Sequence, residues 1–131
     1  MASYIGVLVG FVALGAAQGA DTDYPHRDWG QTVTLDMTVP EAAACITRQM
    51  ARLYGRVIPV PAEGGTDIEG GPGGGFFGTA HDPWVSYQVR SAAQVTTLRV
   101  FYRHPVSQKN ISRDVRRMGA KCLKIAAIRP V

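Results

Sequence analysis

The chain has 131 residues, with 14 Lys and Arg against 10 Asp and Glu, and 46% of its residues are hydrophobic. This length accommodates one domain, and the hydrophobic content is too high for a disordered chain. Two cysteines exclude a dense disulfide scaffold and a four-cysteine zinc site.

Residues 1–19 have the features of a secretory signal peptide. Residues 5–17 carry no charge, and a helix of that length extends about 20 Å, too short for a bilayer core of about 30 Å. Small residues follow, with a cleavage position after Gly19. We therefore expect a secreted or periplasmic protein with no transmembrane span once the signal is removed. Because no Lys or Arg precedes the apolar run, a buried N-terminal strand or helix is the alternative.

Residues 20–30 are polar and contain proline, so we expect an extended leader before a single domain over residues 31–131. Residues 31–39 alternate between apolar and polar side chains, which is the pattern of a half-buried strand.

A helix is predicted directly after this strand. Thr38 and Glu41 have the spacing of a capping box, Pro40 suits the first turn, and Gly55 can end the helix. The apolar face of this helix contains Ala42, Ile46, Gln49, Met50 and Leu53.

Residues 56–61 are apolar and β-branched but contain two prolines, which predicts an edge strand. Residues 63–78 include eight glycines among sixteen residues and predict a long glycine-rich loop. A short strand is expected at residues 76–80.

A β-hairpin is predicted from residues 84–90 and 95–104, with a turn at 91–94. If Arg90 faces Val95, one face of the hairpin is apolar and pairs Val89–Thr96, Tyr87–Leu98 and Val85–Val100. The other face pairs Trp84–Phe101, Ser86–Arg99 and Gln88–Thr97.

The last predicted element is a helix that Ser112 caps and that runs to about Ala126. Its apolar stripe contains Val115, Met118, Cys122 and Ile125. The rest of its surface carries Arg113, Arg116, Arg117, Lys121 and Lys124.

These elements predict a two-layer α+β domain, with an antiparallel sheet of four to five strands and two helices on one face, in the order β-α-β-(β)-β-β-α. Cys45 and Cys122 lie on the buried sides of the two helices, and an oxidising compartment would join them. Closing a loop of nearly eighty residues stabilises the fold by roughly 4 kcal/mol through loop-closure entropy. Two buried free thiols are the alternative.

No motif assigns a reaction, a cofactor or a metal. Gly73-x-Gly75-x-x-Gly78 matches the dinucleotide fingerprint, but no helix follows to hold the pyrophosphate. His26, His81 and His104 are far apart in the sequence, so no metal site is predicted from them.

The charge is divided unevenly along the chain. From Arg90 onward there are ten basic residues and one acid, or +9, and the preceding part has four basic residues and nine acids, or −5. This asymmetry favours an anionic partner, such as an anionic envelope component or an acidic protein. Nucleic acid is the weakest candidate for an exported protein. The alternative is self-neutralisation, in which the basic C-terminal helix lies near the acidic N-terminal leader and the glycine-rich loop.

Six residues are candidates for binding such a partner. An aromatic and basic patch is expected on the outer face of the sheet, next to the basic C-terminal helix. The candidates are Trp84, Arg99, Phe101, Arg103, Arg113 and Arg117. The leader or a second subunit could also cover the sheet residues among them.

Residues 32–46 (TVTLDMTVPEAAACI) resemble the opening of the START/polyketide-cyclase-like helix-grip proteins. In that family a first strand runs into a Pro-Glu-Ala helix, and a curved sheet grips a long final helix. The resemblance implies a hydrophobic ligand cavity, for which Tyr87, Tyr102 and His104 would supply the nearest polar groups.

Three functions follow from these patterns. The first is a small exported, non-enzymatic binding or accessory domain for an anionic partner. The second is a ligand-binding or cyclase-like protein with an interior pocket. The third is a structural homodimer formed through the outer face of the sheet.

Overall fold

The computed structural model describes residues 27–73 and 82–131. The predicted signal, most of the leader, the end of the glycine-rich segment and the short strand expected at 76–80 lie outside the described residues. No helix in the described ranges is both long enough and apolar enough to cross a membrane.

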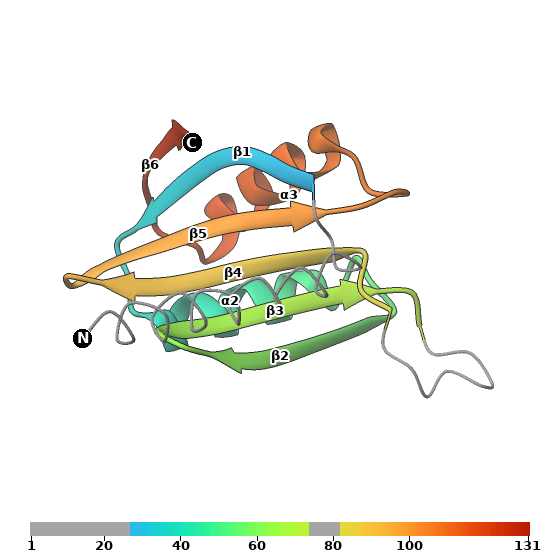
Figure 1. The fold of residues 1–131 in the computed structure, drawn as a ribbon, viewed down its shortest axis with the longest axis horizontal. Coiled ribbons are helices and arrows are strands. Elements are labelled where there is room, and N and C mark those ends of the chain that lie inside the picture. Colours follow the sequence, from blue (N-terminus) through green and yellow to red (C-terminus); the bar gives the residue numbers. More distant parts are fainter. Residues whose placement is uncertain (1–26, 74–81) are drawn as a thin grey trace, which may run out of the picture.

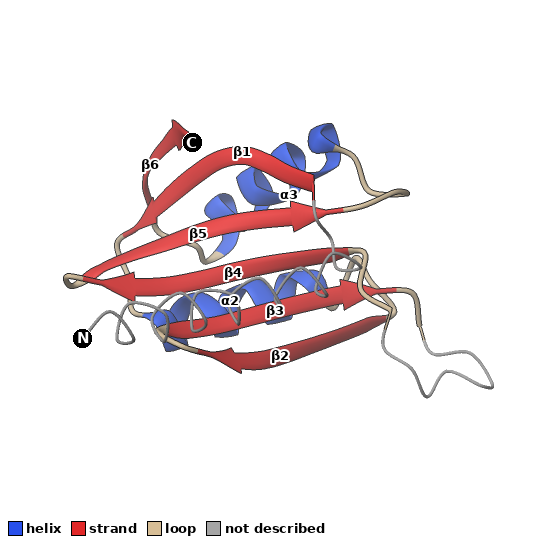
Figure 2. Ribbon diagram, in the orientation of Figure 1, coloured by secondary structure: helices blue, strands red, loops and turns tan. Residues whose placement is uncertain are grey.

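The architecture is α+β, as predicted (Figures 1 and 2). Its elements are β1 (Arg27–Leu35), α2 (Val39–Met50), β2 (Arg56–Ala62), β3 (Gly65–Gly71), β4 (Val85–Ala92), β5 (Val95–Tyr102), α3 (Gln108–Lys121) and β6 (Ile125–Pro130). The strands form one six-stranded sheet in the order β2-β3-β4-β5-β1-β6, and every pair is antiparallel. Both helices lie on one face of the sheet, as expected. The sheet has six strands, more than the four to five expected.

The core lies between the sheet and the two helices. Its fully buried side chains include Ile68, Tyr87, Val89, Leu98 and Val100 from the sheet and Ile46, Met50, Ile111 and Val115 from the helices. Alternate residues of the hairpin strands therefore face the helices, which confirms the predicted apolar face.

Helix α2 begins as the sequence predicts. The Thr38 side chain accepts a hydrogen bond from the Glu41 backbone N–H at 3.3 Å, and the Glu41 carboxylate accepts one from the Thr38 N–H at 3.0 Å. The helix ends at Met50 rather than near Gly55, so Leu53 lies in the following turn and is 41% exposed. The predicted edge strand is confirmed, because β2 is the outermost strand on its side of the sheet.

Strand β1 starts earlier than predicted and takes in the last four residues of the expected leader. Gly30 has a φ of 87° and lies in an irregularity of the β1–β5 pairing, between Asp28 and Thr32. Trp29, only 4% exposed, donates a hydrogen bond from its indole N–H to the Ser112 hydroxyl at 2.9 Å. The leader prediction failed at these residues because the irregularity breaks the simple alternation.

The predicted register of the hairpin is wrong by two residues. Arg90 faces Thr97 and Ser86 faces Phe101, because the turn contains only Ala93 and Gln94. Both turn residues have positive φ, which the tight two-residue hairpin turn requires and which the sequence does not signal with glycine or asparagine. A two-residue shift leaves every side chain on its predicted face, so the face assignment within the strands survives.

Residues 65–71 form strand β3 and not the predicted loop. A side chain at Gly65 would overlap the Val89 carbonyl oxygen of the neighbouring strand. At Gly70, a Cβ would lie 2.7 Å from the end of the Met50 side chain. These glycines therefore permit close packing, whereas the sequence suggested flexibility.

The C-terminal helix also differs from the prediction. Ser107 caps it in place of Ser112, and its side chain accepts the Asn110 backbone N–H at 3.2 Å. The helix ends at Lys121, and Ile125 begins strand β6, which pairs with β1. Helical periodicity continued by coincidence into the strand, so the two elements were predicted as one.

The predicted disulfide joins the two helices. Cys45 lies within α2 and Cys122 is the C-terminal cap of α3, with a Cα–Cα distance of 5.8 Å. Cys45 is 1% exposed, so the bond is part of the layer between the helices and the sheet.

Replacing Gly65 with Ala should destabilise the domain by about 2 kcal/mol or more, because the new methyl group has no space beside the β4 backbone. The measurement is urea unfolding followed by circular dichroism. Gly119→Ala is the control, since a Cβ there meets only the flexible end of the Ile125 side chain, at 2.9 Å. Equal stability of G65A and wild type would contradict the close approach of β3 and β4.

Candidate functional site

The structure separates the six predicted binding residues into different places. Arg99 and Phe101 lie on the outer face of the sheet, with the guanidinium carbon 5.3 Å from the ring centroid. Arg99 also forms an ion pair with Asp28 of β1. This pair of residues was correctly placed on the outer face.

Arg103 and Trp84 lie at the end of the hairpin. Arg103 forms an ion pair with Asp82 and donates a hydrogen bond to the Pro83 carbonyl at 2.9 Å. Trp84 lines a hollow beside α3 together with Tyr54 and Asn110, so it is on the helix side of the sheet. Its predicted pairing with Phe101 on the outer face is wrong, because β4 begins only at Val85 and strand alternation does not extend to Trp84.

The hairpin cations are largely neutralised by acids from the first part of the chain. Arg90 pairs with Asp67 at 2.6 Å, Arg99 with Asp28, and Arg103 with Asp82. Exposed pairs of this kind contribute little stability, but they balance charge locally. Self-neutralisation was expected for the C-terminal helix, whereas the ion pairs found among the described residues neutralise these three hairpin arginines.

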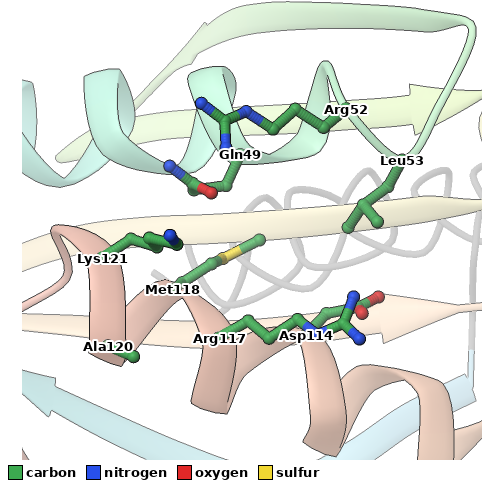
Figure 3. Close-up of a pocket in the computed structure, with 8 residues that line it drawn as sticks. All are labelled: Gln49, Arg52, Leu53, Asp114, Arg117, Met118, Ala120 and Lys121. Atoms are coloured by element: carbon green, nitrogen blue, oxygen red, sulfur yellow. The ribbon is translucent and has the colours of Figure 1, made fainter.

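The cations of α3 have a different environment. A groove of about 330 Å³ runs between the end of α2 and α3 (Figure 3). We call it the helix groove; its lining residues are Gln49, Arg52, Leu53, Asp114, Arg117, Met118, Ala120 and Lys121. Nearly all of the surface that lines it is carbon.

Helical spacing produces both walls of the helix groove. On α3, Asp114, Arg117, Met118 and Lys121 follow the i, i+3, i+4, i+7 pattern that places residues on one face. On the α2 side, Gln49, Arg52 and Leu53 follow the same spacing into the turn after the helix. Figure 3 shows Leu53 and Met118 directed into the space between the helices.

Three cations line the helix groove against one carboxylate. Arg52, Arg117 and Lys121 are exposed, and within the described ranges no acidic side chain forms an ion pair with any of them. Asp114 is paired with its neighbour Arg113, from guanidinium Nε to carboxylate oxygen at 3.3 Å. Among the described residues, these three cations therefore have no ion-pair partner, and the charge of Arg117 acts on the Asp114 carboxyl without a direct pair.

Asp114 is buried at the base of the α3 wall, with 3% of its surface exposed. Burial raises the pKa of its carboxyl group, and the hydrogen bond and charge of Arg113, together with the charge of Arg117, partly oppose that rise. The net direction is upward, so the folded state disfavours the ionised carboxylate relative to the unfolded chain.

A second hollow of about 210 Å³ adjoins the helix groove and shares Leu53 and Asp114 with it. Tyr54 lines this hollow, and burial raises the pKa of its hydroxyl to about 12. Arg113 also lines it, so the two candidate cations of α3 flank neighbouring hollows.

The tyrosines proposed for an interior pocket lie in the core. Tyr87 is fully buried and Tyr102 is 8% exposed. The Tyr87 hydroxyl has no hydrogen-bond partner among the described residues, and burial raises its pKa well above the usual value. His104 is the second residue after the end of β5 and precedes Pro105.

The Cys45–Cys122 disulfide ties the two walls at one end of the helix groove. Gln49 lines the groove, and its amide nitrogen lies 3.8 Å from the Cys122 sulfur. Lys121, on the opposite wall, directly precedes Cys122. The covalent link therefore fixes the separation of Gln49 from Lys121.

The arrangement suits binding of an anion attached to an apolar group. Cations at the rim attract a negative charge. The apolar lining favours burial of an apolar group, because that burial removes apolar surface from water. No three His, Cys, Asp or Glu side chains in the described ranges are grouped to hold a metal ion. Arg52, Leu53 and Lys121 were not predicted as site residues. The helical spacing of α3 could have identified Lys121. Arg52 and Leu53 could not be identified from the sequence, because they join the groove only through the packing of the two helices.

Replacing Asp114 with Asn should stabilise the protein at pH 7. Folding raises the pKa of Asp114, so the free energy of unfolding falls as the pH rises from the pKa of the unfolded chain to the higher pKa of the folded protein. Asn does not ionise, so the variant avoids this loss. Urea unfolding should show the difference disappearing below about pH 3, where the carboxyl is protonated in both states. Asp36→Asn, at an exposed position, is the matched charge control. Lower stability of D114N at pH 7 would mean that the arginine contacts outweigh burial.

Comparisons with protein families, with curated proteins and with solved structures find no match to this chain. Its own residues are therefore the basis for assigning a function.

Proposed function

We propose that the chain is a small exported, non-enzymatic binding domain that recognises an anionic partner through the helix groove. The observation that carries this proposal is the set of three cations, Arg52, Arg117 and Lys121, that line an apolar groove without acidic partners in the described ranges. Arg113, beside the groove, adds a fourth cation that is paired with Asp114.

Export is supported by two independent features. Residues 1–19 have the composition of a secretory signal, with an uncharged run followed by small residues. Cys45 and Cys122 form a disulfide, and such bonds persist mainly in oxidising compartments. We therefore infer that the protein functions outside the reducing cytosol, as a secreted or periplasmic protein.

The recognition surface differs from the sheet patch that the sequence favoured. Arg99 and Arg103 have acidic partners on the hairpin side, and a partner would have to displace Asp28 or Asp82 to reach them. Arg117 has no ion-pair partner to displace among residues 27–73 and 82–131. Its planar guanidinium also suits bidentate contacts to carboxylate or phosphate.

A ligand-binding domain with an interior site is a second candidate. It is favoured by the Tyr87 hydroxyl, which is buried without a hydrogen-bond partner in the described part of the chain. A buried hydroxyl without a partner costs free energy that a polar ligand atom could recover.

Charge reversal in the helix groove tests the first proposal. Wild type, the double variant R52E/R117E and the control R116E are compared for binding to heparin, to vesicles containing anionic lipid and to zwitterionic vesicles. Arg116 lies on the same helix, is exposed and lines none of the hollows described above, so R116E reverses a similar charge away from the groove.

We expect R52E/R117E to lose at least about tenfold in affinity for the anionic probes, and R116E less than about threefold. Binding of the wild type should weaken as salt is raised, because exposed charges are screened. A loss in the double variant no greater than the square of the R116E loss, which is what two additive charge reversals produce, would show that net charge alone governs binding. Binding of no anionic probe, or binding that the double variant retains, would refute the groove as the recognition surface.

A further inference from the structure

We propose that the helix groove takes the hydrocarbon tail of a single-chain anionic amphiphile, a molecule with one alkyl chain and a carboxylate or similar head. This inference rests on the proposed function and specifies the chemical class of the partner. The ligand is a free amphiphile, dissolved as single molecules.

The lining favours a hydrocarbon tail over a polyanion. Leu53 and Ala120 contribute exposed apolar surface beside Met118, which is itself only 1% exposed, and polar atoms account for very little of the groove lining. Leu53 is 41% exposed, which leaves a large apolar side chain in contact with water at the end of the groove that adjoins the second hollow. A polyanion such as an acidic polysaccharide would displace water from these carbon atoms but would place polar groups against them, without forming apolar contacts.

The charged groups have the arrangement that an amphiphile requires. Arg52 extends from one wall, and Arg117 and Lys121 from the other, so three cations lie around the apolar floor against the single carboxylate of Asp114, which is paired with Arg113. Figure 3 shows Arg52 reaching back along α2 toward Gln49, away from Leu53. A head group at the rim can therefore contact cations while its tail lies against Leu53 and Met118.

The dimensions favour one short chain. A volume of about 330 Å³ is at the small end of the range for ligand pockets, about 300–1,000 Å³. A space at this small end of the range suits one short alkyl chain better than the two chains of a membrane lipid.

The disulfide limits the ligand further. It joins α2 to α3 beside Gln49 and Lys121, so the two walls are linked at that end. The α3 wall from Asp114 to Lys121 is about 10 Å long, at 1.5 Å per residue. The groove therefore accepts the end of a flexible chain more readily than a long helix passing through it.

The experiment is calorimetric titration with hexanoate, octanoate and decanoate, each below its micelle concentration. Burial of each added methylene should tighten Kd about threefold to fourfold. Octanol tests the need for a negative head group and should bind at least about tenfold more weakly than octanoate. Circular dichroism confirms that the protein stays folded.

Two variants locate the binding. Leu53→Ser removes the exposed apolar group of the floor, and we expect it to weaken decanoate binding at least about fivefold. Val95→Ser is the matched control, because Val95 is also an exposed hydrophobic residue (46%) but starts strand β5 and does not line the groove. R52E/R117E should weaken octanoate more than octanol.

The outcomes separate this inference from the proposed function. If Kd does not depend on chain length, or if L53S and V95S bind decanoate equally well, the amphiphile inference is overturned. If the amphiphile tests fail in this way but heparin or anionic vesicles still bind through Arg52 and Arg117, the proposed function stands. If the double variant changes the binding of no anionic probe, both are overturned.

Discussion

The covalent bond between Cys45 and Cys122 constrains, at one end, how the two helices lie over the sheet. One sulfur is in the middle of α2 and the other is at the C-terminal cap of α3, so the bond couples elements that are 77 residues apart in sequence. Each helix start is defined locally, by a capping box at Thr38 and another at Ser107. The relative placement of the helices is a tertiary property, and the disulfide constrains it at the end of the groove where Gln49 and Lys121 face each other.

The fold distributes charge so that only part of the chain's basic character is neutralised. Acids at positions 28, 67 and 82 lie within ion-pair distance of hairpin arginines, because the antiparallel sheet places their strands or strand ends beside β4 and β5. The cations of α3 lie on the opposite side of the sheet from the Arg99–Asp28 pair. Within the described residues, the charge asymmetry of the sequence thus becomes three ion-paired hairpin arginines and a helix groove with three cations against one carboxylate.

Local signals predicted the elements whose conformation is determined locally. Thr38 and Glu41 marked the start of α2 correctly, and the two prolines of residues 56–61 identified an edge strand. The apolar face of the hairpin was also correct, because a two-residue register error leaves the faces unchanged. The disulfide followed from two helices that each bury one face against the same sheet.

Other features depend on contacts that a linear pattern does not contain. Ala93 and Gln94 have positive φ although neither is glycine, so the sequence does not indicate the turn conformation. The glycines of β3 allow close packing against Val89 and Met50. Strand β6 was hidden because Ile125 continues the helical spacing of Val115 and Met118. The candidate site was predicted only in part: Arg113 and Arg117 were named, whereas Arg52 and Leu53 become neighbours of α3 only through tertiary packing.

The most direct test is intact mass spectrometry of the mature protein from its native source, with thiol labelling before and after reduction. We predict a chain that begins after Gly19, takes up no label as isolated, and takes up two labels once its disulfide is reduced. Two labels on the unreduced protein, with the N-terminal apolar run still attached, would contradict both the covalent joining of the helices and the export of the protein.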